Sequence, residues 1–265
     1  MKIGIIGNES SHANAFADIL RKMDIEPIID DDLKISADLD GVMITTRDGN
    51  THKSLALPFI KAGIPIWIDK PFTTDFAEAK EIIAAVKSGG TLITGGSTCK
   101  FAPDILGLAN DVKNGEFGEI RSAMLNFPVM LDSPHNGIHF YAHHLVEMTL
   151  AVFGYDLRAV WAFEKNGGIA CLARYDRFDA IMNFQPDVWD GYVTILGTKV
   201  QIVRKLELSS IYKDGVRAFV KMLETRSEPV SRDNLIFPVK VVNAIEKSYM
   251  ESIEVNLQIL QEVPL

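Results

Sequence analysis

The sequence predicts an α/β protein in which a doubly wound parallel sheet over residues 1–120 is followed by an α+β domain with an open antiparallel sheet over residues 121–265. Short apolar runs alternate with helical stretches through the first 120 residues, and this alternation is typical of parallel sheets. Runs of alternating apolar and polar residues follow one another between Leu157 and Leu206, as they do in antiparallel sheets. A chain of 265 residues is long enough for two domains, each with its own core.

Composition and charge argue against several classes of protein. The chain is 47% hydrophobic with a mean hydropathy of +0.10, yet no apolar run reaches the roughly 18 to 20 residues that span a bilayer. The first seven residues lack the pattern of a signal peptide, and two cysteines are too few for a disulfide framework. The net charge of -8 offers no attraction for phosphate backbones. We therefore expect a cytoplasmic protein with a small-molecule substrate and no membrane or nucleic-acid partner.

The first strand is predicted at residues 2–7, where a run rich in β-branched residues stops at Gly7, as a buried parallel strand does. Ser10 or Ser11 can cap the helix that follows. The apolar residues of this helix recur at helical spacing at Ala13, Phe16, Ala17 and Leu20.

The remaining strands and helices of the first domain continue the alternation. Further strands are expected at Pro27–Asp30, Gly41–Thr46, Ile64–Ile68 and Thr91–Gly95, with helices at His52–Ala62 and Asp75–Lys87. Between the second and third strands the chain has only the ten residues from Asp31 to Asp40, which is too short for a helix and another strand. The sheet is therefore expected to lack one edge unit, on the side where the adenosine of a dinucleotide normally lies.

The turn from Gly7 to His12 is the predicted ligand site, because open parallel sheets bind ligands beyond the carboxyl ends of their strands, where strand order reverses. A helix N-terminus there directs N–H groups at a pyrophosphate. Asp30 can accept hydrogen bonds from ribose hydroxyls and disfavours a 2′-phosphate, so NAD is expected, with NADP as the alternative. Of the GxGxxG pattern only the first glycine is present, since Glu9 and His12 take the other two positions. The segment can also be an ordinary strand-to-helix turn.

Several segments resemble the glucose-fructose oxidoreductase and inositol dehydrogenase (Gfo/Idh/MocA) family, and the likeness runs through most of the chain. Asp69-Lys70-Pro71 corresponds to that family's Glu-Lys-Pro signature, and Lys100-Phe101-x-Pro103 to its Arg-Phe-x-Pro element. His144-x-x-Glu147, followed by Phe153-Gly154, resembles its His-x-x-Asp helix. The closing elements of the family match at Phe219, Pro229 and Val239–Ser248.

The resemblance implies a Rossmann-type N-terminal domain with the nicotinamide at the strand end of Asp69-Lys70-Pro71. Lys70 is then the expected catalytic residue, since its ammonium can hydrogen-bond the substrate hydroxyl and stabilise the alkoxide while a histidine accepts the proton. Lys100 is expected to bind substrate. The expected cofactor-binding residues are Gly7, Asn8, Glu9, Ser10, Ser11, His12, Asp30, Thr45, Thr46, His52, Asp69 and Lys70.

Residues 132–148 hold four of the six histidines, and their apolar spacing predicts a helix from about His139 to Phe153. The family's Asp-x-x-x-His pair falls either on Phe140 and His144 or on His139 and His143. The match of His144-x-x-Glu147 favours the first alignment. His144 is then the expected proton acceptor, Glu147 a further catalytic residue, and His139 and His143 substrate-binding residues. Phe140 cannot orient an imidazole as a carboxylate does.

Two other interpretations of these histidines stay open. On the predicted helix His139, His143 and Glu147 follow one another at intervals of four residues, within an arc of roughly 80°. They can therefore share one divalent metal ion, with Asp132 or His135 completing the site. Alternatively, the segment is structural, with polar helix positions, a capping histidine and one buried imidazole.

The second domain is predicted to contain strands at Arg158–Glu164, Ile169–Tyr175 and Ala180–Gln185, with a hairpin turn at Gly167-Gly168. One face of this sheet should pack on helices, and the C-terminal helix is expected to pack back on the first domain. In the resembled family the open face commonly forms a subunit interface. A homo-oligomer, either a dimer or a tetramer, is therefore expected.

The favoured function is that of an NAD(P)-dependent oxidoreductase that transfers a hydride between nicotinamide and a hydroxyl or carbonyl group of a sugar, polyol or similar small polar substrate. One alternative is a non-catalytic ligand sensor with weakened cofactor binding, which the missing glycines, Glu9 and the short Asp31–Asp40 connection favour. The other is a metal-dependent lyase or isomerase built on His139, His143 and Glu147.

Overall fold

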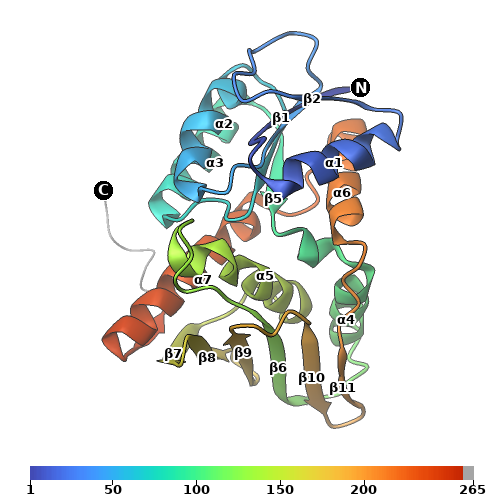
Figure 1. Ribbon diagram of the computed structural model, residues 1–265. Coiled ribbons are helices and arrows are strands. Elements are labelled where there is room, and N and C mark those ends of the chain that lie inside the picture. Colours follow the sequence, from blue (N-terminus) through green and yellow to red (C-terminus); the bar gives the residue numbers. More distant parts are fainter. Residues whose placement is uncertain (259–265) are drawn as a thin grey trace. The chain divides into compact units, whose positions relative to one another are not determined.

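The computed structural model describes residues 1–258, which fall into two compact units (Figure 1). Unit 1 consists of Met1–Phe101 and Ser210–Val239, and unit 2 of Ala102–Ser209 and the described residues from Lys240 on. This division differs from a single boundary at residue 120. The helix α4 (Pro103–Lys113) packs on α5 (Ala142–Phe153) in unit 2, whereas α6 (Ile211–Thr225) returns to pack on α1 (Ser11–Arg21) in unit 1.

Unit 1 contains a five-stranded parallel sheet with the strand order β2-β1-β3-β4-β5. Its strands are β1 (Lys2–Ile6), β2 (Glu26–Ile29), β3 (Gly41–Ile44), β4 (Ile66–Asp69) and β5 (Ile93–Gly96). The strand order reverses at β1, because β2 lies on one side of it and β3 on the other. The predicted doubly wound sheet without one edge unit is confirmed.

Helices cover both faces of this sheet (Figure 1). On one face α2 (His52–Lys61), α3 (Phe76–Gly89) and the start of α7 (Arg232–Glu251) share a core with strand residues Val42, Ile44, Ile66 and Ile68. On the other face α1 and α6 share a core with Ile3, Ile5, Met43 and Trp67. Strands buried on both faces need apolar residues at successive positions, which explains the continuous apolar runs of the sequence.

Capping residues set the starts of two of these helices. The Ser10 side chain accepts a hydrogen bond from the His12 N–H and caps α1, and the Asp75 carboxylate accepts hydrogen bonds from the N–H groups of Ala77 and Glu78 and caps α3. The predicted apolar face of α1 is buried at Ala13, Phe16, Ala17 and Leu20. These helix starts follow directly from local sequence.

The short connection after β2 covers the sheet instead of extending it. A Cβ at Gly4 of β1 would overlap the side chain of Leu33, so Leu33 packs directly against the backbone of this strand. The residues between β2 and β3 therefore fold over the edge of the sheet at the place where a longer chain would add a helix and a strand.

Unit 2 is built on a seven-stranded sheet with the order β11-β10-β6-β9-β8-β7-β12. All neighbouring strands are antiparallel except β6 and β9. Its strands are β6 (Ile120–Pro128), β7 (Ala159–Lys165), β8 (Gly168–Arg174), β9 (Asp179–Gln185), β10 (Tyr192–Gly197), β11 (Gln201–Lys205) and β12 (Glu254–Asn256). The three strands predicted between Arg158 and Gln185 correspond to β7, β8 and β9.

The hairpin between β7 and β8 turns one residue earlier than predicted. Lys165 pairs with Gly168, so the two turn residues are Asn166 and Gly167, with φ values of 56° and 77°. Positive φ at both positions is typical of a type I′ turn, which asparagine followed by glycine favours.

Within residues 1–258, short 3₁₀ segments lie at Gly49–Thr51 (η1), Thr98–Phe101 (η2) and Gly137–Phe140 (η3). Across residues 1–258, no helix combines the length and the apolar character that crossing a membrane requires.

Candidate active site

The polar residues of unit 1 gather beyond the carboxyl ends of its strands. Asp31 follows β2, Gly7 follows β1, Arg47 lies beyond β3, and Asp69 and Lys70 lie at the end of β4. Because all these strands are parallel, their carboxyl ends lie along one edge of the sheet, here called the strand-end edge. The strand order β2-β1-β3-β4 places the groups along this edge in the order Asp31, Gly7, Arg47 and then Asp69 with Lys70. The edge includes the point where strand order reverses, which is where open parallel sheets bind ligands.

The turn after β1 has no room for a side chain at its first residue. Gly7 has a φ of 111°, and a Cβ there would lie 2.7 Å from the carbonyl carbon of Thr45 and 2.9 Å from its hydroxyl oxygen. The Asp31 carboxylate accepts hydrogen bonds from the backbone N–H groups of Gly7 (2.7 Å) and Asn8 (2.9 Å). The turn therefore presents donors suited to an anion, and a carboxylate of the same chain occupies two of them.

Asp31, not Asp30, reaches this turn. The Asp30 carboxylate instead accepts a hydrogen bond from the backbone N–H of Asp32, 2.9 Å away, within its own loop. The role of Asp30 in binding ribose stays a prediction, and Asp31 joins it as a carboxylate on the same side of the sheet.

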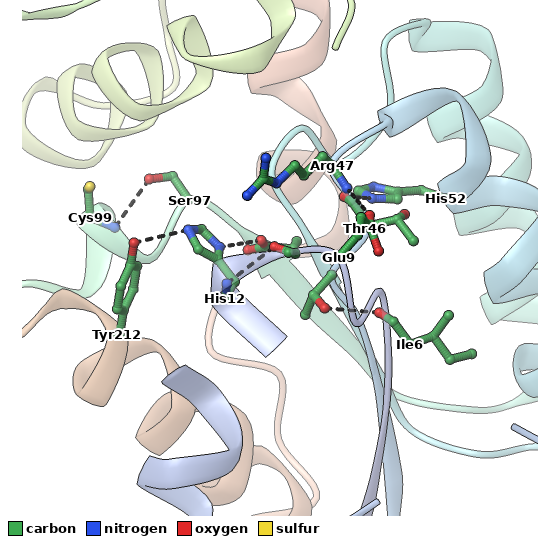
Figure 2. Close-up of polar contacts among 12 residues, drawn as sticks. Ile6, Glu9, His12, Thr46, Arg47, His52, Ser97, Cys99 and Tyr212 are labelled. Carbon is green, nitrogen blue, oxygen red and sulfur yellow. Dashed lines mark hydrogen bonds and ion pairs between the residues drawn. The ribbon is translucent and has the colours of Figure 1, made fainter. Parts of the chain in front are cut away.

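A buried histidine links the first helix to the end of β4 (Figure 2). His12 Nδ1 lies 2.6 Å from Asp69 Oδ2, and the Tyr212 hydroxyl of α6 lies 3.1 Å from His12 Nε2. Burial would raise the pKa of the Asp69 carboxyl, but the charge and hydrogen bond of His12 lower it, and the pKa ends below its usual value. Asp69 is therefore a buried anion held in place by His12.

Lys70 follows this anion and is itself buried, with 7% of its surface exposed. Burial lowers the pKa of the Lys70 ammonium, the neighbouring Asp69 carboxylate opposes this shift, and the charge of Arg47 adds to it. The Lys70–Pro71 peptide bond is cis. A buried ammonium beside a carboxylate can donate a strong hydrogen bond and release its proton more readily than an exposed lysine does.

The loop after β3 is held from inside the unit. The fully buried ring of His52 lies between two carbonyl oxygens, with Nε2 2.9 Å from that of Thr46 and Nδ1 3.3 Å from that of Phe72. Burial lowers the pKa of His52 below its ordinary value, so the ring is neutral near pH 7. The Thr45 hydroxyl donates to the carbonyl oxygen of Ile6. These side chains support the loop, and their roles in binding a cofactor stay predictions.

Glu9 joins the turn after β1 to the loop after β3. Its Oε1 accepts a hydrogen bond of 2.9 Å from the backbone N–H of Arg47. Glu9 is exposed, so its carboxylate lies at the surface of the strand-end edge, close to the point of strand reversal.

A cavity of about 530 Å³ opens beside Asp31, between the loop after β2 and the helix α2. Apolar side chains form much of its wall, and polar residues complete the lining. The lining residues are Ile6, Asp31, Asp32, Leu33, Lys34, Ile35, Ser54, Leu55, Pro58 and Phe59. A cavity of this size, with apolar walls and the carboxylates of Asp31 and Asp32 in its lining, suits a planar heteroaromatic ring joined to a group with hydroxyls.

Lys100 lies in η2 and is 4% exposed. Its Nζ donates a hydrogen bond of 2.6 Å to the carbonyl oxygen of Gly95 and so ties η2 to β5. A contact between Lys100 and substrate stays a prediction.

The histidines of unit 2 do not share one helix, and His135 lies in a turn before η3. His139 belongs to η3, and α5 begins only at Ala142, with Tyr141 (φ −120°) between them. The prediction of one helix from His139 is therefore wrong at its N-terminus. Asn136 and Gly137 have φ values of 70° and 54°, and this left-handed backbone starts a separate short turn.

Each of these histidines has its own surroundings. His139 Nε2 lies 3.3 Å from Glu246 Oε2 of α7, and this hydrogen bond lowers the pKa of the Glu246 carboxyl. The ring of His144 packs against Phe127 and Tyr141 at centroid distances of 5.7 and 5.4 Å. The catalytic and substrate-binding roles assigned to this segment stay predictions.

The metal alternative gains no support from this geometry. His143 and Glu147 are buried on α5, while His139 lies on η3 with its ring centroid 6.2 Å from that of His143. Among residues 1–258 no three or more His, Cys, Asp and Glu side chains come together in a way that could hold a metal ion.

Sequence reasoning missed two residues of the strand-end edge, Arg47 and Tyr212. Arg47 follows Thr45-Thr46 just beyond a strand end, and this position was a usable signal. No local signal in the sequence pointed to Tyr212, because it lies 200 residues from its partner His12 in the chain.

Comparison with known proteins assigns the first part of the chain to a family. A family profile described as "Oxidoreductase family, NAD-binding Rossmann fold" (GFO_IDH_MocA) matches residues 2–96. The chain is 23% identical over 202 residues to an uncharacterized oxidoreductase of Schizosaccharomyces pombe, which covers 72% of this chain and 54% of the relative. It is 26% identical over 130 residues to inositol 2-dehydrogenase 1 of Saccharopolyspora erythraea, covering 48% and 36%. The chain thus spans about half or less of the length of these relatives.

Solved structures share the fold over nearly the whole chain. A putative myo-inositol dehydrogenase from Sinorhizobium meliloti has a TM-score of 0.80 at 16% identity and covers 97% of this chain and 99% of its own. A scyllo-inositol dehydrogenase from Lactobacillus casei, solved with bound NAD(H) and scyllo-inositol, has a TM-score of 0.79 at 15% identity, covering 97% and 99%. At these identities the likeness establishes the fold.

Proposed function

Because this chain belongs to the Gfo/Idh/MocA oxidoreductase family, we propose that it is an NAD-dependent dehydrogenase acting on a hydroxyl or carbonyl group of a sugar, polyol or similar small polar molecule. The observation that carries this proposal is the buried pair of Asp69 and Lys70 at the end of β4. An ammonium held at a strand end beside a fixed anion is suited to stabilise an alkoxide.

The strand-end edge of unit 1 fits a dinucleotide. Gly7 allows a turn in which a Cβ would overlap the backbone of Thr45 and Thr46, and the N–H groups of this turn already bind a carboxylate. The cavity beside Asp31 has the lining for adenine and ribose. Lys70 lies on the opposite side of the point of strand reversal, since the sheet order runs β2-β1-β3-β4. An extended dinucleotide would therefore run from the Asp31 cavity, across Gly7, to Lys70.

Bound NAD would supply the hydride acceptor or donor. In the proposed reaction Lys70 donates a hydrogen bond to the substrate oxygen and stabilises the negative charge that grows on it as the hydride leaves. The Asp69 carboxylate favours the charged form of the ammonium, and His12, whose Nε2 lies next to the Tyr212 hydroxyl, keeps Asp69 in place. His144 is the proton acceptor that the resemblance implies, and its assignment rests on that resemblance.

We further propose that NAD is preferred over NADP. The loop after β2 carries three consecutive carboxylates, Asp30, Asp31 and Asp32, and the structure directs Asp31 at the turn after β1. A 2′-phosphate in this neighbourhood would meet like charge.

The test is a titration of the metal-free protein with NADH and NADPH, followed by a screen of polyols and sugars for turnover. We expect NADH to bind in the micromolar range, and Lys70→Ala to keep this binding while losing about 10²-fold or more in turnover. Lys61→Ala, which changes an exposed lysine at the end of α2, is the matched control. Equal turnover by Lys70→Ala and wild type would refute the assignment of Lys70.

A second candidate function is a ligand sensor without catalysis. It is favoured by the carboxylates of Asp31 and Glu9, which occupy the backbone N–H groups of Gly7, Asn8 and Arg47 at the place where a phosphate would bind. If the wild type binds no NADH and Glu9→Gly restores binding, the sensor function is the better account.

We also propose that the protein is cytoplasmic, because its two free, buried cysteines stay reduced in that compartment.

We further propose that the chain forms a homo-oligomer through the open face of its second sheet. Cross-strand pairing places one largely apolar row across this face: Trp161, Leu172, Ile181, Met124, Thr194 and Val203. Val203 is 78% and Trp161 36% exposed. Light scattering should show a dimer or tetramer that Val203→Glu with Trp161→Glu dissociates; a monomeric wild type would refute the proposal.

A further inference from the structure

The charge balance around the turn after β1 is the feature that the proposed function leaves unexplained. Pyrophosphates usually bind to free N–H groups at a strand-to-helix turn. Here the N–H groups of Gly7 and Asn8 bond to Asp31, and the N–H of Arg47 bonds to Glu9. Two negative side chains therefore lie where two further negative charges would have to bind, and a cation is needed to offset them.

The sheet order fixes where a pyrophosphate would cross this edge. The loop after β2 forms one wall of the cavity beside Asp31, and Lys70 lies at the end of β4. The link between adenosine and nicotinamide must then pass the ends of β1 and β3, which lie between them in the sheet. Arg47 stands just beyond the end of β3, at this crossing point.

The side chain of Arg47 has the properties of a ligand-binding group. It is half-buried, and within residues 1–258 its guanidinium takes part in no hydrogen bond or ion pair. Figure 2 shows the side chain extending away from His52, toward the side of the view on which His12 lies. The charge of the guanidinium also lowers the pKa of the Lys70 ammonium.

We propose that the Arg47 guanidinium is the main pyrophosphate-binding group of this chain and that it takes over the role that free backbone N–H groups have in glycine-rich turns. This inference rests on the proposed NAD-dependent function. A guanidinium suits the role because its planar fork can donate two hydrogen bonds to phosphate oxygens, and its charge offsets Glu9 and Asp31.

The test compares the binding of NADH and of ADP-ribose to wild type, Arg47→Gln and Arg47→Lys at low salt. ADP-ribose carries the pyrophosphate without the nicotinamide, so it reports on this contact alone. We expect Arg47→Gln to raise both dissociation constants about ten- to hundredfold and Arg47→Lys to raise them less, because lysine keeps the charge but loses the fork. Arg21→Gln, at the far end of α1 in an exposed pair with Asp18, is the control and should match wild type.

Each other outcome counts against the inference in a distinct way. If wild type binds NADH and Arg47→Gln binds NADH and ADP-ribose equally well, Arg47 does not hold the pyrophosphate, and the proposed function stands. If Arg47→Gln changes only the KM for substrate, the guanidinium serves the substrate instead, and the inference is overturned. If wild type binds neither NADH nor ADP-ribose, the inference and the proposed function both fall. Thermal unfolding of Arg47→Gln and Arg21→Gln shows whether both variants are folded.

Discussion

The two ends of the strand-end edge of unit 1 differ in how their charged groups are held. At the β4 end, Asp69 and Lys70 are buried, and His12 of α1, whose Nε2 lies next to the Tyr212 hydroxyl of α6, holds the Asp69 anion. At the β2 end, Asp31 is exposed, and its carboxylate is hydrogen-bonded to the backbone of a neighbouring loop. The proposed catalytic end is thus part of the core, whereas the proposed adenosine end is a surface loop.

This difference indicates at which positions of the site a substitution leaves the fold intact. Buried ionic groups are costly to disturb, because removing one partner leaves another charge buried without compensation. Exposed carboxylates are screened by solvent and salt, so their loss changes binding more than stability. We therefore expect changes at the β4 end to act on folding and catalysis, and changes at the β2 and β1 ends to act on cofactor affinity.

The largest effect is expected for Asp69→Ala. This change leaves the buried Lys70 ammonium and the His12 ring without their anion, and the free energy of unfolding should fall by about 3 to 5 kcal/mol. Denaturant unfolding measures it. Asp69→Asn keeps the shape of the side chain and tests the charge alone if the alanine variant does not fold.

Asp18→Ala is the matched control, because Asp18 forms an exposed ion pair with Arg21 on α1. Exposed pairs contribute about 0 to 1 kcal/mol, so this variant should stay close to wild type. Similar losses in Asp18→Ala and Asp69→Asn would contradict the contrast between the buried and exposed ends.

In the exposed turn after β1, Glu9→Gln should strengthen NADH binding about three- to tenfold at low salt and change stability little. The glutamine can still accept the hydrogen bond of the Arg47 N–H, while the negative charge near the pyrophosphate is lost. The gain should shrink as salt is added, because salt screens exposed charges. Glu26→Gln, at the opposite end of β2, is the control. Weaker NADH binding by Glu9→Gln would mean that this carboxylate helps to form the site.

The same contrast explains what the sequence could predict. The strands, the caps at Ser10 and Asp75 and the missing edge unit depend on residues close together in the chain, so the parallel sheet could be predicted from local patterns. Asp69 and Lys70 form a local motif as well. Their support could not be predicted in the same way, because Tyr212 reaches His12 only after the chain has passed through unit 2 and returned.

The histidine segment shows a second limit of local patterns. Apolar spacing favoured one helix from His139 to Phe153, yet Asn136 and Gly137 adopt left-handed backbone and begin a separate 3₁₀ turn. His139 and His143 therefore do not lie on one face of a single helix, although they are four residues apart. Once His139 left the helix, the geometric argument for a shared metal ion lost its basis.

A smaller effect is expected from pH at His52. Burial lowers its folded-state pKa below the ordinary histidine value of 6.5, so the unfolded chain binds a proton more readily than the native protein does. Stability should therefore fall as pH drops below 6.5 toward the folded-state pKa, by at most about 1.4 kcal/mol per pH unit from this group. Thermal unfolding between pH 7 and 5 should show a shallower fall in His52→Asn. An identical slope would show that other groups carry the pH dependence.

The smallest effect is expected for Tyr212→Phe, which removes one hydroxyl from the buried end. The phenylalanine ring keeps the contacts with His12 and Phe16, so the loss should be that of one hydrogen bond, about 0.5 to 1.5 kcal/mol in unfolding free energy. Tyr192→Phe, on an exposed strand position of unit 2, provides the comparison. If Tyr212 acts only through packing, turnover should stay at the wild-type level. A fall in turnover at unchanged NADH affinity would instead show that the hydroxyl, through His12 and Asp69, helps to position the Lys70 ammonium for the reaction.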